Sequence, residues 1–388
     1  MTARDRARVR LRSASRPAIG VAVVAALALL NLPTIGAIEP PSSPARAGRA
    51  APPRTELYLS FVGDVMQHER NIEMPDYDRL YDPVRGALFA DDLSFANIEF
   101  PVDPARPPAG YPLFNGSIAY LRSALGAGFS VLALANNHTF DYGVSSITAS
   151  WAVYDELGDE LAVYHNGIRA RPGAPIEPTT IVYGGRRIGF VSITSFSNVW
   201  GSEPFIYQVP YWNGRARSSF LASVRDWADR YDLLVVAIHA GEEYVLEPDA
   251  DKAAFFREVA DAGADIVWGH HPHVLQPWER HGESVVMHSA GNFVSAQRRA
   301  QSPWLPFGRW APTGDAAVYR VRVDWSDRGV RITDVRTPFY TVRDDPAHGL
   351  VLKSFPGLLR EPMPLEWRAF YLARYSVLHR GLRASASD

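Results

Sequence analysis

Short apolar runs that end in polar turns recur along the first three quarters of the chain. Five of these runs are rich in aromatic and β-branched side chains: residues 57–62, 93–96, 129–135, 233–238 and 264–268. Runs of this length and composition are typical of buried β-strands. The third run is followed by a polar turn and then by an amphipathic stretch at residues 144–157, which predicts a helix. The pattern therefore predicts an α/β fold with buried strands.

Side chains of the types that bind metals follow all five predicted strands. They are Asp64, Glu99, the pair Asn137 and His138, His239, and the pair His271 and His273. Loops converge at the carboxyl ends of strands in an α/β sheet, so the recurrence predicts one shared site. Imidazole is a common metal ligand, and the spacing of His271 and His273 lets both rings reach one ion or two adjacent ions. Taken singly, Asp64 or Glu99 is better interpreted as a helix cap or a surface ion-pair partner, and only the recurrence favours a shared site.

Six motifs carry a resemblance to a known family. They are Gly63-Asp64-Val65-Met66, Asn97-Ile98-Glu99, Ala135-Asn136-Asn137-His138 with Asp141-Tyr142-Gly143, His239-Ala240-Gly241-Glu242-Glu243-Tyr244, Gly269-His270-His271-Pro272-His273, and Gly291-Asn292-Phe293. In this order they resemble the CapA family of bacterial capsule and poly-γ-glutamate synthesis proteins, which is similar in fold to the calcineurin-like metallophosphoesterases. The resemblance covers residues 57–297 and implies a metallophosphatase-like two-sheet sandwich flanked by helices, with four αββα layers.

The resemblance also implies a centre that holds one or two divalent metal ions. The residues that would bind them are Asp64, Glu99 and His273 for the first ion, with Glu99 at the bridging position, and Asn137, His239 and His271 for the second. His138 matches a histidine that protonates a leaving oxygen, and Asp141 would orient its ring. Manganese, zinc, iron and magnesium are not distinguished by this ligand set.

One position departs from the metallophosphoesterase pattern. Those enzymes have a histidine two residues after the first aspartate, where this chain has Met66. His68 would replace that ligand if the loop curls back, but we expect His68 to be a surface residue. A single-metal centre built on Asn137, His239 and His271 therefore remains an alternative to a two-metal centre.

Other polar residues of the motifs have candidate supporting roles. Glu243 is a candidate partner for a metal-binding histidine or, equally, a solvated charge. Asn136 and Asn292 are candidates for binding a substrate anion or for satisfying turn backbone. Strand alternation points His270 away from its neighbours, so we leave it out of the ligand set. The irregular, aromatic-rich segment 196–214 is expected either to wall the cleft or to cover a sheet edge.

The first 56 residues predict where the chemistry takes place. Residues 1–37 contain six arginines ahead of an uninterrupted apolar stretch at 18–30, which indicates a signal peptide or an N-terminal membrane anchor. Residues 38–56 are rich in proline, alanine and serine and are expected to form a disordered tether. Both alternatives place the catalytic domain outside the cytoplasm, either secreted or anchored to the membrane.

Composition narrows the classes of partner. The first 50 residues hold eight arginines and two acids, so the remainder of the chain is mildly acidic. It has no basic block that would follow a phosphate backbone, so we do not expect nucleic acid as a partner. Cysteine is absent, so any metal site must use oxygen and nitrogen ligands.

Residues 298–388 are expected to pack on the same domain. Alternation of apolar and polar residues at 316–325 predicts a half-buried strand. Residues 365–382 have aromatic and basic residues at helical spacing, so a helix is expected there, either packed on the domain or lying on a membrane surface.

Two functions of different classes fit these observations. The first is a metal-dependent hydrolase or transferase, metallophosphoesterase-like in its centre, that acts on an envelope polymer or its phosphorylated precursor. The second is a non-catalytic subunit that retains the fold within a polyglutamate or capsule assembly or export complex, with capsule-assembly membrane proteins as its partners.

Overall fold

The computed structural model describes residues 55–297, 302–326, 329–345 and 348–382. By its internal contacts the chain divides into residues 1–50 and residues 51–388, and all the described residues belong to the second unit. The predicted leader and nearly all of the predicted tether lie outside the described residues. Among the residues that are described, none of the helices is both long and apolar enough to cross a membrane.

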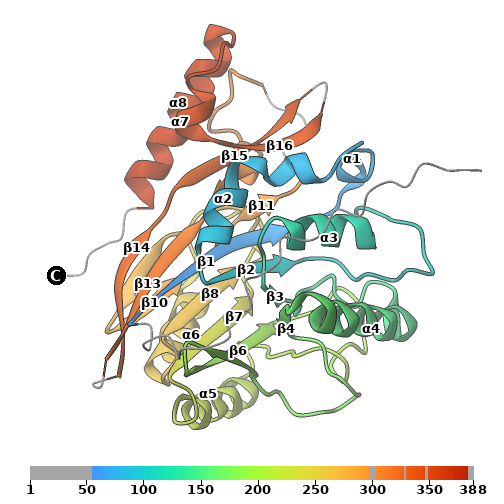
Figure 1. Cartoon of the computed structure of the whole chain (residues 1–388), viewed down its shortest axis with the longest axis vertical. Coiled ribbons are helices and arrows are strands. Elements are labelled where there is room, and N and C mark those ends of the chain that lie inside the picture. The colour runs from blue at the N-terminus through green and yellow to red at the C-terminus, as the bar shows by residue number, and fades with distance from the viewer. Residues whose placement is uncertain (1–54, 298–301, 327–328, 346–347, 383–388) are drawn as a thin grey trace, which may run out of the picture. The chain divides into compact units, whose positions relative to one another are not determined.

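Two large sheets form the centre of the unit (Figure 1). The first has the strand order β14-β13-β1-β2-β3-β4, and β11 also pairs with β1. Its strands are β1 (Glu56–Val65), β2 (Leu93–Ile98), β3 (Val131–Ala133), β4 (Tyr164–Asn166), β11 (Asn292–Val294), β13 (Tyr319–Ser326) and β14 (Gly329–Arg336). Strands β1 to β4 are parallel to one another, as expected for strands joined through helical crossovers.

The second sheet has the order β5-β6-β7-β8-β10-β9. Its strands are β5 (Thr179–Tyr183), β6 (Arg186–Thr194), β7 (Leu233–His239), β8 (Ile266–His270), β9 (Trp278–His281) and β10 (Ser284–Met287). A small third sheet contains β12 (Asp315–Ala317), β15 (Phe339–Asp345) and β16 (Gly349–Ser354). Strands β6, β7, β8 and β10 are parallel, so they share one carboxyl edge.

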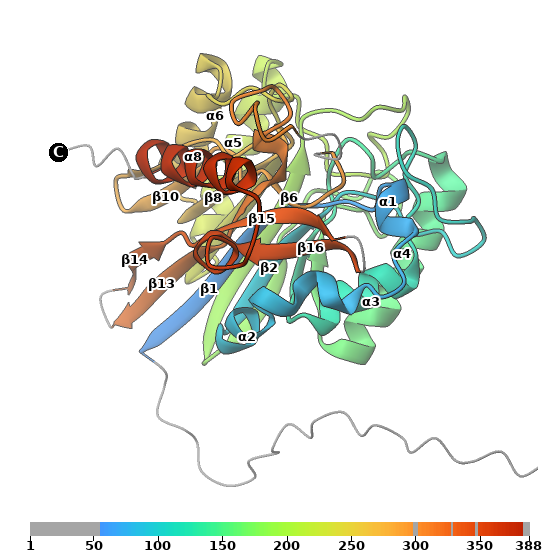
Figure 2. The ribbon, with the colours of Figure 1, turned by 90° about the horizontal axis from the view of Figure 1, so that it is seen from above.

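Helices cover the outer faces of the paired sheets. On one side lie α2 (Asp82–Ala90), α3 (Ile118–Gly126) and α4 (Gly143–Leu161), and on the other lie α5 (Gly214–Ala228) and α6 (Ala250–Asp261), as Figure 2 shows. The remaining helical segments are α1 (Glu69–Ile72), η1 (Asp78–Tyr81), η2 (Pro312–Gly314), α7 (Phe355–Leu358) and α8 (Leu365–Gly381). The predicted four-layer αββα sandwich is therefore confirmed.

The core between the two sheets is built from large aromatic side chains. Phe61 stacks on Phe95 with ring centroids 4.5 Å apart, and Trp268 from the second sheet meets Phe61 edge-on at 5.5 Å. Phe190 meets Phe95 at 5.5 Å. Because these rings come from β1, β2, β6 and β8, they fix the two sheets against each other. That contact holds the carboxyl ends of both sheets at one edge.

The C-terminal segments complete the same core. In β13 the side chains of Tyr319, Val321, Val323 and Trp325 are buried and alternate with more accessible residues, as the sequence predicts. β13 pairs antiparallel with β1 and so extends the first sheet. Helix α8 adds Phe370, Tyr371 and Leu378 to the same hydrophobic cluster, while Leu365 and Leu372 are exposed.

Candidate metal centre

The predicted ligands come together where parallel strands of both sheets end. Asp64 in β1 lies in register with Asn97 in β2, and His239 in β7 lies in register with His270 in β8. Asp64 is also tied to the neighbouring chain because its backbone N–H donates to the Gly291 carbonyl at 2.8 Å. The sheet ladders therefore fix the backbone that carries the predicted ligands.

One set of donor atoms comes from Asp64, Glu99 and His273, all within 4.8 Å of one another. The Oδ2 atom of Asp64 lies 3.2 Å from Nδ1 of His273. The Oε1 atom of Glu99 lies 3.7 Å from Nε2 of the same ring. His273 Nδ1 is also 3.0 Å from Oδ1 of Asn292, which accepts its hydrogen when Nε2 is the metal-binding nitrogen.

A second set comes from Glu99, His239 and His271, again within 4.8 Å. Glu99 Oε1 lies 3.6 Å from Nε2 of His239, and the same nitrogen is 2.7 Å from Oδ1 of Asn137. Glu99 is therefore shared by the two sets, which is the placement expected of a bridging carboxylate. The structure thus brings all six predicted metal-binding residues into one cluster.

The electrostatics of this cluster fit divalent cations. Asp64 Oδ2, both carboxylate oxygens of Glu99 and Nδ1 of His271 are buried without a hydrogen-bond partner among the described residues. Burial, followed by the charge of Asp64, holds the pKa of Glu99 well above its usual range. Burial and the neighbouring imidazoles hold the pKa values of His239 and His271 far below the usual range. Neutral rings beside orphaned carboxylate oxygens are a donor set that a cation satisfies.

The turn that carries His271 and His273 has an unusual backbone. His271 has φ +97° and His273 has φ +56°, both in the left-handed region that residues with side chains rarely adopt. This backbone directs both rings back into the cluster, where their centroids are 5.8 Å apart.

His138 and Asp141 form a pair beside the donor sets. Nδ1 of His138 lies 2.8 Å from Oδ2 of Asp141, so the carboxylate accepts the Nδ1 hydrogen. Asp141 Oδ2 also accepts the backbone N–H of Phe114 at 2.7 Å, and the Phe114 ring packs against the imidazole at 4.6 Å. The amide of Asn198 lies 3.5 Å from both ring nitrogens. The structure therefore brings the side chains of His138 and Asp141 into direct contact.

The three predicted supporting residues have different surroundings. Asn292 contacts His273, and its amide donates to the carbonyl of Thr313 at 2.9 Å, which fixes its orientation. Asn136 donates to the carbonyl of Ile98 at 2.8 Å and so holds the loop rather than facing a ligand. Glu243 is exposed, yet its carboxylate belongs to a third donor group with His271 and His273.

Two residues of the cluster, Asn97 and His270, are not among the predicted site residues. Asn97 donates from Nδ2 to Oδ1 of Asp64 at 2.8 Å and so orients that carboxylate. Its signal was its position at the start of the Asn97-Ile98-Glu99 motif. His270, which alternation had removed from the set, is fully buried and shares a donor group with Asp64 and His239. Burial lowers the pKa of His270 to about 4.

The expectation that His68 lies at the surface is wrong. Its side chain is buried, and its ring packs edge-on against Phe114 at 5.1 Å. Nδ1 of His68 lies 3.3 Å from the backbone nitrogen of Ala296, from which it accepts. Met66 is buried as well. Within the described residues, none of the candidate donor groups includes His68.

The aromatic segment 196–214 has residues at the cluster and residues in the core over the second sheet. Phe196 meets the His271 ring at 4.9 Å and so lies at the cluster. Tyr207 and Tyr211 are buried in the core beneath α5 and α6, where they cover the second sheet. Trp200 is almost completely exposed at 96%.

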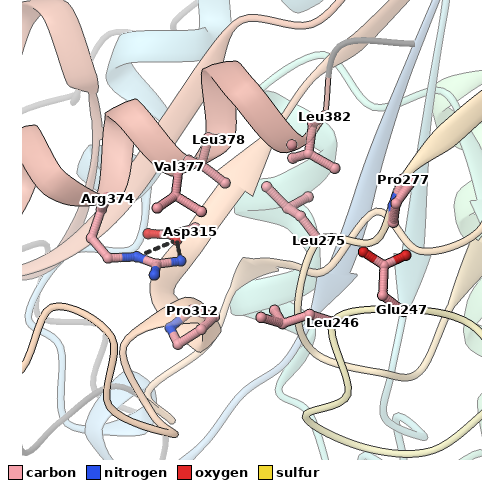
Figure 3. Close-up of a pocket in the computed structure, with 11 residues that line it drawn as sticks. Leu246, Glu247, Leu275, Pro277, Pro312, Asp315, Arg374, Val377, Leu378 and Leu382 are labelled. Atoms are coloured by element: carbon pink, nitrogen blue, oxygen red, sulfur yellow. Dashed lines mark hydrogen bonds and ion pairs between the residues drawn. The ribbon is translucent and has the colours of Figure 1, made fainter. Parts of the chain in front are cut away.

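A separate cavity of about 110 Å³ lies beneath α8 (Figure 3). Apolar side chains line most of it: Leu246, Leu275, Val377, Leu378 and Leu382. Arg374 of α8 donates from Nε to Oδ2 of Asp315 at 2.9 Å at one wall, and both side chains are buried. None of the predicted metal ligands lines this cavity, so it is distinct from the metal centre.

The fold and the site define the class of protein. Two packed sheets flanked by helices, with carboxylate, amide and imidazole donors at their shared carboxyl edge, describe an αββα sandwich protein with a candidate metal centre. The chain belongs to the family described as bacterial capsule synthesis protein PGA_cap, whose profile matches residues 58–297. The family expected from the six motifs is therefore confirmed.

Two known relatives agree with this assignment. The chain is 28% identical over 301 residues to the PGA biosynthesis protein CapA of Bacillus subtilis (strain 168), covering 73% of each chain. It is 28% identical over 296 residues to the capsule biosynthesis protein CapA of Bacillus anthracis, covering 72% of this chain and 66% of that one. Among solved structures, TT1561 of Thermus thermophilus matches 73% of this chain and all of its own at 13% identity, with a TM-score of 0.38.

Proposed function

We propose that this protein is a metal-dependent hydrolase or transferase that acts outside the cytoplasm on an envelope polymer or on its phosphorylated precursor. The observation that carries the proposal is the His138–Asp141 pair beside the metal donor sets. The His138 imidazole is close enough to influence the pKa values of both His239 and His271. A purely structural subunit does not need a carboxylate that fixes the tautomer of a histidine at this place.

The roles of the chain's own residues follow from the geometry. Asp141 accepts the Nδ1 hydrogen of His138 and so orients the ring, which leaves Nε2 as the nitrogen that donates a proton to a leaving oxygen. Asn292 accepts from Nδ1 of His273 and leaves the other ring nitrogen facing Glu99. When bound, divalent ions supply Lewis-acid polarisation of the attacked group and activate a water for attack.

Two further observations support the target and the location. The relatives carry the names PGA biosynthesis and capsule biosynthesis protein, which supports an envelope polymer as the target. The arginine-rich start and apolar stretch at residues 18–30 support export, either as a secreted protein or anchored at the membrane.

The second candidate function is a non-catalytic subunit of a capsule or polyglutamate assembly complex with membrane partners. Met66 favours it, because it stands where metallophosphoesterases have a histidine ligand and so weakens the first metal site. This candidate predicts metal binding without turnover.

The two candidates are separated by metal analysis combined with turnover. The purified protein should contain a divalent metal and hydrolyse a chromogenic phosphodiester or γ-linked polyglutamate. His138→Ala should keep its metal and lose at least about a hundredfold in kcat, the usual contribution of a general acid. His281→Ala is the matched control, since His281 pairs with Asp261 in a partly exposed position. Bound metal without activity on either substrate would favour the assembly role.

A further inference from the structure

The side chain of Arg309, at the edge of the metal centre, has unusual surroundings. Arg309 is exposed, and its guanidinium carbon lies 5.4 Å from the ring centre of Tyr244 and 5.1 Å from that of Trp310. Tyr244 and Trp310 meet edge-on at 4.8 Å. We name Tyr244, Arg309 and Trp310 together the aromatic shelf. Residue 309 lies beyond the segment that matches the family profile, which ends at 297.

The aromatic shelf is tied directly to the metal centre. The ring of Tyr244 lies 6.0 Å from the ring of His273. The backbone N–H of Tyr244 donates to the carbonyl of Pro272 at 2.8 Å, which attaches the shelf to the turn between the two metal-binding histidines. The Tyr244 hydroxyl accepts from Gln297, and Gln297 accepts from Asn292, the residue that orients His273. Arg309 is therefore one ring away from a predicted ligand.

The guanidinium of Arg309 lacks an acidic partner within the described parts of the chain. Several other arginines that lie over aromatic rings there also bond a carboxylate, as Arg106 does with Asp103 and Arg217 with Glu258. A guanidinium over a ring face is held by its charge, while its N–H donors stay available for a planar oxyanion. The aromatic shelf thus holds the Arg309 guanidinium in place beside the metal centre, where it is exposed to solvent and has no acidic partner among the described residues.

We propose that Arg309 is a specificity-determining residue that binds an oxyanion of the substrate next to the group being cleaved or transferred. The inference rests on the proposed function and names its substrate class: a polymer or precursor whose repeat carries a carboxylate or a phosphate. Either oxyanion accepts the paired N–H donors of arginine. Tyr244 and Trp310 hold the guanidinium in place, and the ring of Tyr244 links it to His273.

Binding measurements test this proposal separately from turnover. The full chain in the His138→Ala background, loaded with Mn²⁺, is titrated calorimetrically with a γ-linked glutamate oligomer in one arm and with glycerol phosphate in the other. Arg309→Gln should weaken binding of the recognised anion about ten- to a hundredfold, as expected when a charge-assisted contact is lost. Arg309→Lys keeps the charge but loses the paired donors, so its affinity should fall between the two. The arm that binds identifies the source of the oxyanion.

The controls keep the two proposals apart. Arg331→Gln removes an exposed cation on the outer strand β14 and should leave the affinity unchanged. Equal affinity of Arg309→Gln and the parent protein, equal losses in both arginine variants, or no binding of either anion would overturn the role of Arg309. If the wild-type protein turns over substrate and Arg309→Gln binds the anion as tightly as its parent, the hydrolase proposal stands and only the role of Arg309 is refuted. If Arg309→Gln binds the anion more weakly but the wild-type protein shows no turnover, the role of Arg309 stands and the hydrolase proposal is refuted.

Discussion

Lys252 offers a sharp test of how burial shifts the charge state of a side chain in this protein. It is one of two lysines in the chain, lies on α6 and is completely buried. Its Nζ donates to Oε1 of Gln276 at 2.9 Å and lies 5.3 Å from the centre of the Phe256 ring. Burial lowers the pKa of Lys252 from 10.5 to about 7, against the opposing effects of Asp249 and Asp64. Replacing Lys252 with methionine keeps the side-chain length and removes the charge.

The expected magnitude follows from the two pKa values. A fall from 10.5 to about 7 corresponds to roughly 5 kcal/mol of destabilisation when the amine is charged, at ~1.4 kcal/mol per pH unit. The variant leaves the Gln276 oxygen unsatisfied, which costs about 1–3 kcal/mol. Lys252→Met should therefore be about 2–4 kcal/mol more stable than the wild type at pH 6.

The sign of the pH dependence is fixed by proton binding. Between pH 7 and pH 10.5 the unfolded chain keeps the proton on Lys252 and the folded protein releases it, so wild-type stability rises with pH. Below pH 7 both states are charged and the destabilisation is complete. The advantage of Lys252→Met should thus shrink by about 2–3 kcal/mol between pH 7 and pH 9.

Urea denaturation at pH 6, 7 and 9 in the presence of a chelator measures these differences. Lys353→Met is the matched control, because Lys353 is partly exposed and pairs with Glu361 at 2.8 Å. It should change stability by less than about 1 kcal/mol at each pH. Identical pH profiles for Lys252→Met and the wild type would refute the reasoning and show that water reaches the buried amine.

Two further predictions concern polar contacts around the site. Asn292→Ala removes the acceptor that orients His273, so metal affinity measured by calorimetry should fall about 10- to 100-fold; an unchanged affinity would contradict the orienting role. Arg374→Met leaves the buried carboxylate of Asp315 without its guanidinium and should cost about 3–5 kcal/mol in urea denaturation, most of which Asp315→Asn in the same chain should restore. A cost below about 1 kcal/mol would mean that solvent reaches Asp315.

The fold class, and the clustering of the candidate ligands, could be predicted from the sequence because both depend on local pattern. Apolar strands such as β1 and β7 are continuous in the sequence, and their candidate ligands stand at or next to the last residue: His239 ends β7, and Asp64 lies one residue before the end of β1. Parallel pairing then brings the strand ends to one edge without further information.

Other parts of the site depend on contacts between residues that are distant in the sequence. Asn97 orients Asp64 only because β1 and β2 pair in the register that sets the two opposite each other. The prediction from strand alternation leaves His270 out of the cluster, because a side chain that faces the opposite side of its strand is assumed to be distant from the site. In this protein the first sheet packs on that face of β8, and the His270 ring lies 4.2 Å from the ring of Trp268, which belongs to the core between the sheets.

His68 illustrates the same limit in the opposite direction. A histidine four residues after Asp64, in a polar stretch, gives no local sign of burial. The residues that cover it, Phe114 and Ala296, are far along the chain. Tertiary packing between distant loops, rather than the composition of its own segment, makes it an interior residue.

The left-handed backbone at His271 and His273 changes how substitutions there are to be understood. For residues with a Cβ such a conformation costs about 1–2 kcal/mol each, and glycine avoids that penalty. Two positions of one turn, His271 and His273, combine an imidazole side chain with this unfavourable φ angle. A glycine there deletes the ligand and relaxes the main chain at once, whereas an alanine deletes only the ligand. The difference in stability between the glycine and the alanine variants thus measures the backbone strain in the turn.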